Sequence, residues 1–166
     1  MACVIMTMAA TTKQTLQQAG LAALRVVMGG LFLYAAATKV PDMAAFAEDI
    51  ANYRMMPASL ISWVAPAVVG VELAAGLAMV SGVWARAGAW IVAVMLAVFM
   101  VGLSQALLRG IDLRCGCFGG SETATWGTVA RDAAMLAATA IVIWRGPGRL
   151  LWFIGARRAD STASAS

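Results

Sequence analysis

The sequence predicts an all-α fold, an integral membrane bundle of four transmembrane helices. Of its 166 residues, 62% are hydrophobic and 12% are charged, and the mean hydropathy is +0.84. Soluble domains are about 45–50% apolar and about 25% charged, so this chain departs in both respects. Four apolar stretches approach the roughly 20 helical residues that cross about 30 Å of hydrocarbon. No stretch alternates polar with apolar residues as a half-buried strand does.

The four predicted spans have recognisable ends. The first stops at Lys39, just before Pro41, and the fourth carries Trp126 and Trp144 at its two ends, where interfacial aromatic residues are expected. Each span must pair its own backbone groups in hydrocarbon, which requires helices. The predicted spans cover about residues 21–37, 60–80, 87–108 and 126–144.

The connections between the spans differ in kind. Between spans one and two, Phe46, Ile50 and Tyr53 recur at spacings of four and three, which predicts a short amphipathic helix at the membrane interface. The turn at 81–86 is short, so spans two and three should be antiparallel neighbours. The third connection, 109–125, carries two closely spaced cysteines.

The distribution of charge predicts the topology. Residues 1–20 contain no continuous apolar signal-peptide core and are interpreted as a cytoplasmic segment, and residues 145–166 as a basic, partly disordered cytoplasmic tail. An even number of spans puts both termini on one side. That side holds six cations and one acid: Lys13, Arg86, Arg145, Arg149, Arg157 and Arg158, with Asp160. The positive-inside rule makes this side cytoplasmic, which predicts a cell (inner) membrane protein with the cysteine connection in the periplasm or outside the cell.

The chemistry-bearing motif is Cys115-Gly116-Cys117. A disulfide between two cysteines one residue apart is strained and therefore easily reduced. It would stabilise the fold little, because it closes a very short loop. We therefore interpret Cys115 and Cys117 as a candidate redox pair. Arg114 and Arg131 would favour the thiolate. Two alternatives stay open: binding of a soft metal such as Cu(I), or plain loop residues.

Other functional classes receive no support from the composition. The absence of histidine excludes imidazole general bases and His-ligated zinc or haem. The basic residues form no single patch, so a nucleic-acid partner is not predicted. No cofactor or metal is predicted, and Cys3 is interpreted as an ordinary thiol.

Charged residues lie within the predicted spans, where ionised groups are costly and face a partner. Counted from the outer ends of their spans, Arg25 and Glu72 lie at depths of about 21 and 18 Å, which predicts an ion pair between them. Asp132 is expected to pair with Arg131 or with another helix. Gly70, Ala74 and Ala78 form a small-residue stripe that favours close helix packing.

The sequence resembles the MauE/DoxX family of redox-associated membrane proteins over about residues 20–145. The resemblance depends most on Asn52-Tyr53-Arg54-Met55-Met56-Pro57 and Cys115-Gly116-Cys117-Phe118-Gly119, together with Arg25, Gly29, Lys39, Glu72, Trp126 and Arg131. It implies a bundle related to vitamin K epoxide reductase-like proteins. It also implies a role in methylamine utilisation, in which MauE and a thioredoxin-like partner help to mature the disulfide-rich small subunit of methylamine dehydrogenase.

The resulting hypothesis is a membrane component of a thiol–disulfide exchange or protein-maturation system. Its expected partners are the lipid bilayer and an extracytoplasmic thioredoxin-like protein or cysteine-rich client. Which cysteine attacks and the direction of electron flow stay open, and quinone use has no support because the chain lacks the second cysteine pair of a complete relay. The alternatives are a non-enzymatic scaffold for a redox partner and a Cu(I)-handling protein.

Overall fold

A computed structural model describes the backbone of residues 2–110 and 125–148, and their side chains from Gln14 onward. No strand occurs in these ranges, which confirms the all-α prediction. The elements in chain order are α1 (Ala2–Lys39), the 3-10 turn η1 (Val40–Asp42), α2 (Met43–Asn52), α3 (Ala58–Ser81), α4 (Ala85–Leu108) and α5 (Trp126–Arg145).

Helices α1, α3, α4 and α5 are long and apolar enough to cross a membrane. Their outer surface is apolar as well. Large side chains such as Trp63, Leu108 and Trp144 are 77%, 76% and 83% exposed, a pattern expected for a surface solvated by lipid. The protein is therefore a multi-pass membrane protein with a helical bundle.

The predicted spans agree with the helices. The second, third and fourth coincide with α3, α4 and α5 to within two residues at each end, and the first lies inside α1. Helix α1 is 38 residues long, however, and extends far beyond the predicted first span. The polar residues before Gly20 end the apolar stretch, but Thr, Lys and Gln do not stop a helix and no proline interrupts the segment.

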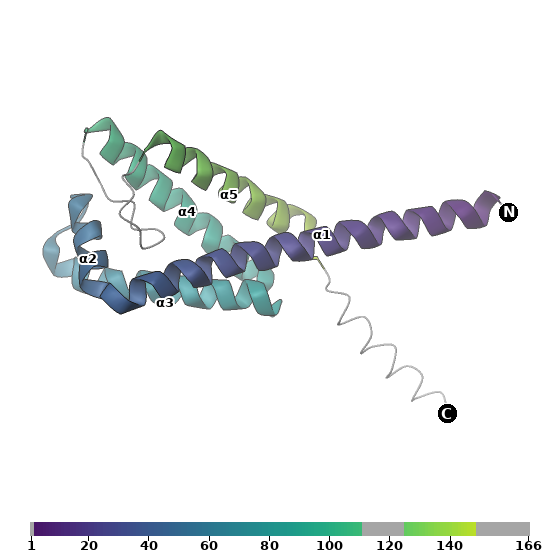
Figure 1. Ribbon diagram of the computed structural model, residues 1–166, viewed down its shortest axis with the longest axis horizontal. Helices are drawn as coiled ribbons and strands as arrows, with labels where there is room; N and C mark the ends of the chain where they lie inside the picture. The colour runs from purple at the N-terminus through teal and green to yellow at the C-terminus, as the bar shows by residue number, and fades with distance from the viewer. Residues whose placement is uncertain (1, 111–124, 149–166) are drawn as a thin grey trace, which may run out of the picture.

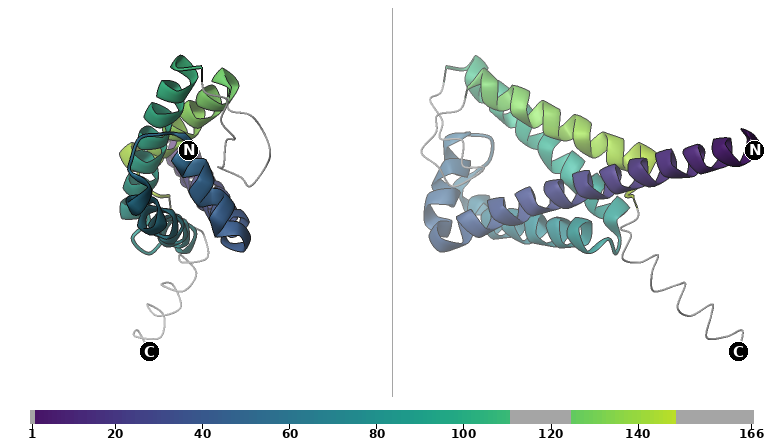
Figure 2. Two further views of the ribbon diagram at one scale, coloured as in Figure 1. Left: turned by 90° about the vertical axis from the view of Figure 1, so that its left-hand side faces the viewer. Right: turned by 45° about the vertical axis from the view of Figure 1, so that its right-hand side comes forward.

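The bundle consists of two helix pairs. Helix α1 lies along α3 and α5 lies along α4, with α3 also packed on α4; the two pairs diverge toward the end that carries α2 (Figures 1 and 2). The antiparallel order puts the end of α1, α2, the start of α3, the end of α4 and the start of α5 at this one end. The buried core lies between the pairs and is formed chiefly by Met28, Phe32, Ala75, Met79, Ala89, Val92, Leu96 and Val142.

Two glycines set the register between α1 and α3. A Cβ at Gly29 would lie 2.9 Å from the Gly76 carbonyl oxygen, and one at Gly76 would lie 3.0 Å from the Gly29 carbonyl oxygen. The helix backbones thus touch at this crossing. The stripe expected to pack was a different one: Gly70 and Ala74 are exposed, and Gly70 has nothing within 4 Å of an added Cβ. That prediction was wrong for Gly70 and Ala74, whereas Ala78 does pack on α4, since a Cβ at Gly88 would lie 3.1 Å from the Ala78 Cβ.

The first connection contains the predicted short helix. Asp42 caps α2, since its carboxylate accepts a hydrogen bond from the Ala45 backbone N–H at 2.9 Å. Helix α2 packs on α3. Its location at the membrane interface stays a prediction. The turn between α3 and α4 is as short as expected, with Gly82 and Trp84 both in the left-handed region (φ 83° and 59°).

Candidate functional site

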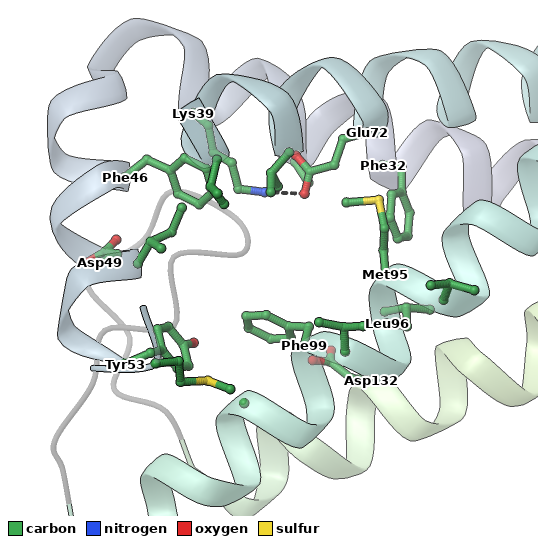
Figure 3. A pocket seen from close by; sticks show the side chains of 18 of the residues that line it. Phe32, Lys39, Phe46, Asp49, Tyr53, Glu72, Met95, Leu96, Phe99 and Asp132 are labelled. Carbon is green, nitrogen blue, oxygen red and sulfur yellow. Dashed lines mark hydrogen bonds and ion pairs between the residues drawn. The ribbon is translucent and has the colours of Figure 1, made fainter. Parts of the chain in front are cut away.

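A cavity of about 360 Å³ lies between the helix pairs at the α2 end of the bundle. Figure 3 shows Lys39 and Glu72 on one wall, Phe99 and Asp132 on the opposite wall, and Phe46, Asp49 and Tyr53 of the α2 segment closing the side. Most of the remaining lining is aliphatic or thioether: Leu31, Ala35, Ile50, Met55, Met56, Val64, Val68, Val94, Met95, Leu96, Val98 and Met135. The cavity is thus apolar with a few buried polar groups, which is the usual composition of a ligand site.

The strongest polar contact in the cavity joins α1 to α3. Lys39 Nζ donates to Glu72 Oε1 at 2.6 Å, and both side chains are almost fully buried. The ammonium also lies 5.1 Å from the centre of the Phe46 ring, a cation–π distance. Lys39 in the last turn of α1 therefore links α1, α2 and α3.

The predicted ion pair between Arg25 and Glu72 is not formed, because Lys39 takes the place of Arg25. The physical reason is register. With Gly29 opposite Gly76, the residue opposite Glu72 is near Leu33, which is eight residues from Arg25. Eight helical residues correspond to about 12 Å, too far for a direct contact. The depths counted from the span ends did not include this displacement of eight residues between Arg25 and the position opposite Glu72.

Arg25 instead lies at the other end of α3. Its side chain is buried, and a Cβ at Gly82 would lie 2.5 Å from Arg25 Nη1. Gly82 is the left-handed residue that ends α3, and its N–H bonds to the Ala78 carbonyl oxygen. The cation thus sits beside a helix C-terminus, where the helix dipole favours positive charge.

Replacing Gly82 with alanine is expected to destabilise the protein. The left-handed conformation costs a non-glycine residue about 1 kcal/mol, and the new methyl group would displace the Arg25 guanidinium. We expect a lower midpoint of thermal unfolding in detergent. Gly30→Ala is the matched control, since a Cβ there meets nothing within 4 Å. Equal midpoints for the two variants would contradict the packing of Arg25 on this turn.

Asp132 and Arg131 form a second ion pair, as one of the two sequence alternatives anticipated. The Arg131 Nε and Nη2 atoms lie 3.1 Å from Asp132 Oδ1. Asp132 is buried and lines the cavity, whereas the Arg131 side chain is 39% exposed. Glu72 Oε2 and Asp132 Oδ2 are buried and have no hydrogen-bond partner within the described part of the chain.

The apolar face predicted for the first connection forms part of the cavity lining. Phe46, Ile50 and Tyr53 all line the cavity, and the Tyr53 ring packs edge-on against Phe99 at 6.2 Å between ring centres. Lys39 and Phe99 were not predicted as site residues. The signal for Lys39 was present in the sequence, because a buried glutamate on one span needs a cation at the matching level of its neighbour.

The predicted redox residues Cys115, Cys117 and Arg114 lie outside the described residues, and the side chain of Cys3 does as well. The helix ends on either side of the connection that carries these cysteines show where it joins the bundle. Helix α4 ends at Leu108 and α5 begins at Trp126. Gly102 and Asp132, each six residues from one of these ends, line the cavity. The cysteine-bearing connection is therefore attached to the bundle at the cavity end.

Metal binding involving the cysteines is not tested by this geometry. Within residues 2–110 and 125–148, no three histidine, cysteine, aspartate or glutamate side chains gather as a metal site. The Cu(I) alternative requires Cys115 and Cys117, which lie outside these ranges.

Comparison with known proteins identifies the family. The family model described as methylamine utilisation protein MauE matches residues 17–145, a range that covers the cavity-lining helices and both paired cysteines. The chain belongs to the MauE family. A curated MauE, the methylamine utilization protein MauE of Paracoccus denitrificans, is 32% identical over 127 residues, which cover 75% of this chain and 68% of that protein. No solved structure matches the chain. The MauE part of the sequence resemblance is thus confirmed.

Proposed function

We propose that this chain is the membrane component of an extracytoplasmic thiol–disulfide exchange system that matures a protein of methylamine utilisation, with Cys115 and Cys117 as its redox pair. The pathway is that of the MauE family and of its Paracoccus member, both of which are named for methylamine utilisation. The observation that carries the chemistry is the Cys115-Gly116-Cys117 segment, held in a connection whose two ends lie at the cavity end of the bundle.

The proposed reaction exchanges one disulfide for another. A thiolate of the pair attacks a disulfide of the partner and forms a mixed disulfide, releasing one partner thiolate. The second cysteine then attacks the mixed disulfide, which forms the Cys115–Cys117 disulfide and releases the second partner thiolate. Two electrons pass from the pair to the partner, and the reverse sequence of steps oxidises the partner. The strain expected of a Cys-x-Cys ring favours the second of these directions, because a strained disulfide is easily reduced.

The proposed setting is the cell inner membrane with the cavity end outward. The described charges support this orientation. The cavity end carries Asp42, Glu48 and Asp49 beside its cations, whereas Arg86 and Arg145 flank the opposite end, where no acid lies nearby among the described residues. A basic end of this kind faces the cytoplasm. The partner is a thioredoxin-like protein or a cysteine-rich client on the outer side.

The proposal includes the finer relations of the fold. We place the bundle with the DoxX-like and vitamin K epoxide reductase-like membrane proteins, and α2 at the membrane interface. The amphipathic pattern of α2 supports the latter, because its large apolar residues Phe46 and Ile50 face the cavity while Glu48 is exposed.

Differential alkylation of intact cells tests the redox assignment. A membrane-impermeant maleimide is applied with and without a reductant, and the labelled sites are read by mass spectrometry. We expect reductant-dependent labelling at Cys115 and Cys117 from outside the cell. We also expect Cys115→Ser or Cys117→Ser to abolish growth on methylamine, with Cys3→Ser as the control that leaves growth unchanged.

Three outcomes would contradict the proposal. Normal growth of the Cys115→Ser/Cys117→Ser double variant would favour the alternative that the protein is a scaffold without redox chemistry. Labelling from the cytoplasmic side alone would reverse the orientation. Retention of stoichiometric Cu(I) by the purified wild type, together with a pair that never forms a disulfide, would favour a copper handler.

A further inference from the structure

The cavity holds two carboxylates that each lack one hydrogen bond. Glu72 and Asp132 come from α3 and α5 and line the same space, and they are 7% and 2% exposed. In each, one oxygen has a cationic partner, while the other, Glu72 Oε2 or Asp132 Oδ2, has none within the described residues. A buried acceptor without a donor is costly, and native structures seldom leave one unsatisfied.

The charges in the cavity indicate whether the hydrogen-bond donor to these two oxygens is neutral or cationic. Lys39 neutralises Glu72 at 2.6 Å and Arg131 neutralises Asp132 at 3.1 Å. The other titratable groups of the lining, Asp49 and Tyr53, each have an interaction of their own. Because both carboxylates already have a counter-charge, the two remaining oxygens call for neutral donors and not for a further cation.

The remaining lining residues indicate the polarity and the size of the ligand. The walls are aliphatic, thioether and aromatic, with Phe32, Phe46 and Phe99 facing the space (Figure 3). A volume of about 360 Å³ accommodates one or two rings or a short chain, which is small for a ligand site. Since the surrounding outer surface of the bundle is apolar, a ligand that dissolves in the bilayer can reach it.

We propose that this cavity binds a neutral, membrane-soluble hydroxyl compound, whose hydroxyl groups donate hydrogen bonds to Glu72 Oε2 and Asp132 Oδ2. The site is argued separately from the proposed cysteine chemistry, because the residues that carry it, Glu72, Asp132 and their partners, lie on the described helices. It assigns a binding role to Glu72 and Asp132, which lie too far inside the helices to be part of the cysteine connection.

A photo-crosslinking competition on the purified full-length protein tests the proposal. The probe is a 4-alkylphenol with a diazirine in its alkyl chain, and its attachment sites are mapped by mass spectrometry. The competitors are 4-hexylphenol, hexylbenzene and 4-hexylbenzylamine, which share an apolar body and differ in the polar group. We expect labelling of cavity-lining peptides, and displacement by 4-hexylphenol at a concentration about tenfold lower than by hexylbenzene, the effect of one satisfied buried acceptor.

The variants identify the acceptors. Asp132→Leu and the double variant Lys39→Met/Glu72→Leu each remove one acceptor without leaving a fully buried unpaired charge, because the Arg131 side chain is 39% exposed. Because a phenol has a single hydroxyl donor, each variant alone leaves it one acceptor, and the combination of both variants is expected to reduce the preference for the phenol to about threefold or less. Thr139→Val is the control: Thr139 is a buried polar residue of α5 outside the cavity lining, bonded to the Met135 carbonyl oxygen at 2.8 Å, and its loss should leave the preference unchanged.

Several results would overturn the inference. Equal displacement by 4-hexylphenol and hexylbenzene would mean that water satisfies the two oxygens. Stronger displacement by the benzylammonium ion would mean a cation site. Labelling confined to the outer surface, or an unchanged preference when both acceptors are removed together, would mean that the cavity is not the binding site. Loss of the cysteines does not affect these measurements, so failure here is distinguishable from failure of the proposed exchange function.

Discussion

Glu72→Leu alone is expected to destabilise the protein by about 3–5 kcal/mol, since it leaves the Lys39 ammonium buried without its counter-charge. Lys39 is 5% exposed and its Nζ lies 2.6 Å from Glu72 Oε1. The double variant Lys39→Met/Glu72→Leu replaces both charges with apolar groups of similar size, and we expect it to recover most of the lost stability. The free energies of unfolding of the wild type, Lys39→Met, Glu72→Leu and the double variant, measured by denaturant titration in detergent, give the coupling between the two residues.

Glu48→Leu is the matched control for this cycle, because Glu48 is exposed on the same end of the molecule and lies outside the cavity lining. It should change the free energy of unfolding by about 0.5 kcal/mol or less. If the double variant is as unstable as Glu72→Leu, with no coupling between the positions, the buried ion pair does not exist in the folded protein.

Gly76→Ala is expected to cost about 1–3 kcal/mol, since it forces a methyl group into a filled crossing between α1 and α3. A Cβ at this position would lie 2.8 Å from Leu33 Cγ and 3.0 Å from the Gly29 carbonyl oxygen. The backbone of α1 has to move away, because the carbonyl oxygen cannot rotate aside. The measurement is again the free energy of unfolding in detergent.

Gly70→Ala isolates the steric effect from the helical preference of alanine. Both positions lie within α3, but a Cβ at Gly70 meets nothing within 4 Å. Alanine forms helices better than glycine, so Gly70→Ala should be neutral or slightly stabilising. A similar loss of stability in both variants would mean that the two helices do not cross at Gly76.

The architecture was predictable from the sequence because lipid imposes one rule on every span. Backbone groups in hydrocarbon must be paired within a helix, so a long apolar stretch fixes both the type of element and its approximate bounds. This is why α3, α4 and α5 were found to within two residues. The start of α1 was missed because hydropathy reports where lipid begins and carries no information on where a helix begins.

The candidate site was predicted only in part, because a site depends on register and rotation. Glu72, Arg131 and Asp132 were singled out as intramembrane charges, and the spacing of Phe46, Ile50 and Tyr53 identified one face of α2 correctly. The partner of Glu72 was not predicted correctly, since counting residues from the span ends gives the depth of a side chain with an error of several residues. Several glycines occur on α1 and α3, and the sequence does not say which of them touch.

The crossing at Gly29 and Gly76 is a fixed point between α1 and α3. The two helices are held in backbone contact there, whereas Lys39, which lines the cavity, lies ten residues further along α1. Ten residues form an arm of about 15 Å. A change of about 5° in the crossing angle therefore moves Lys39 by about 1.3 Å, enough to turn a hydrogen bond of 2.6 Å into a broken contact. A small tilt of α1 against α3 is thus sufficient to break the contact between Lys39 and Glu72.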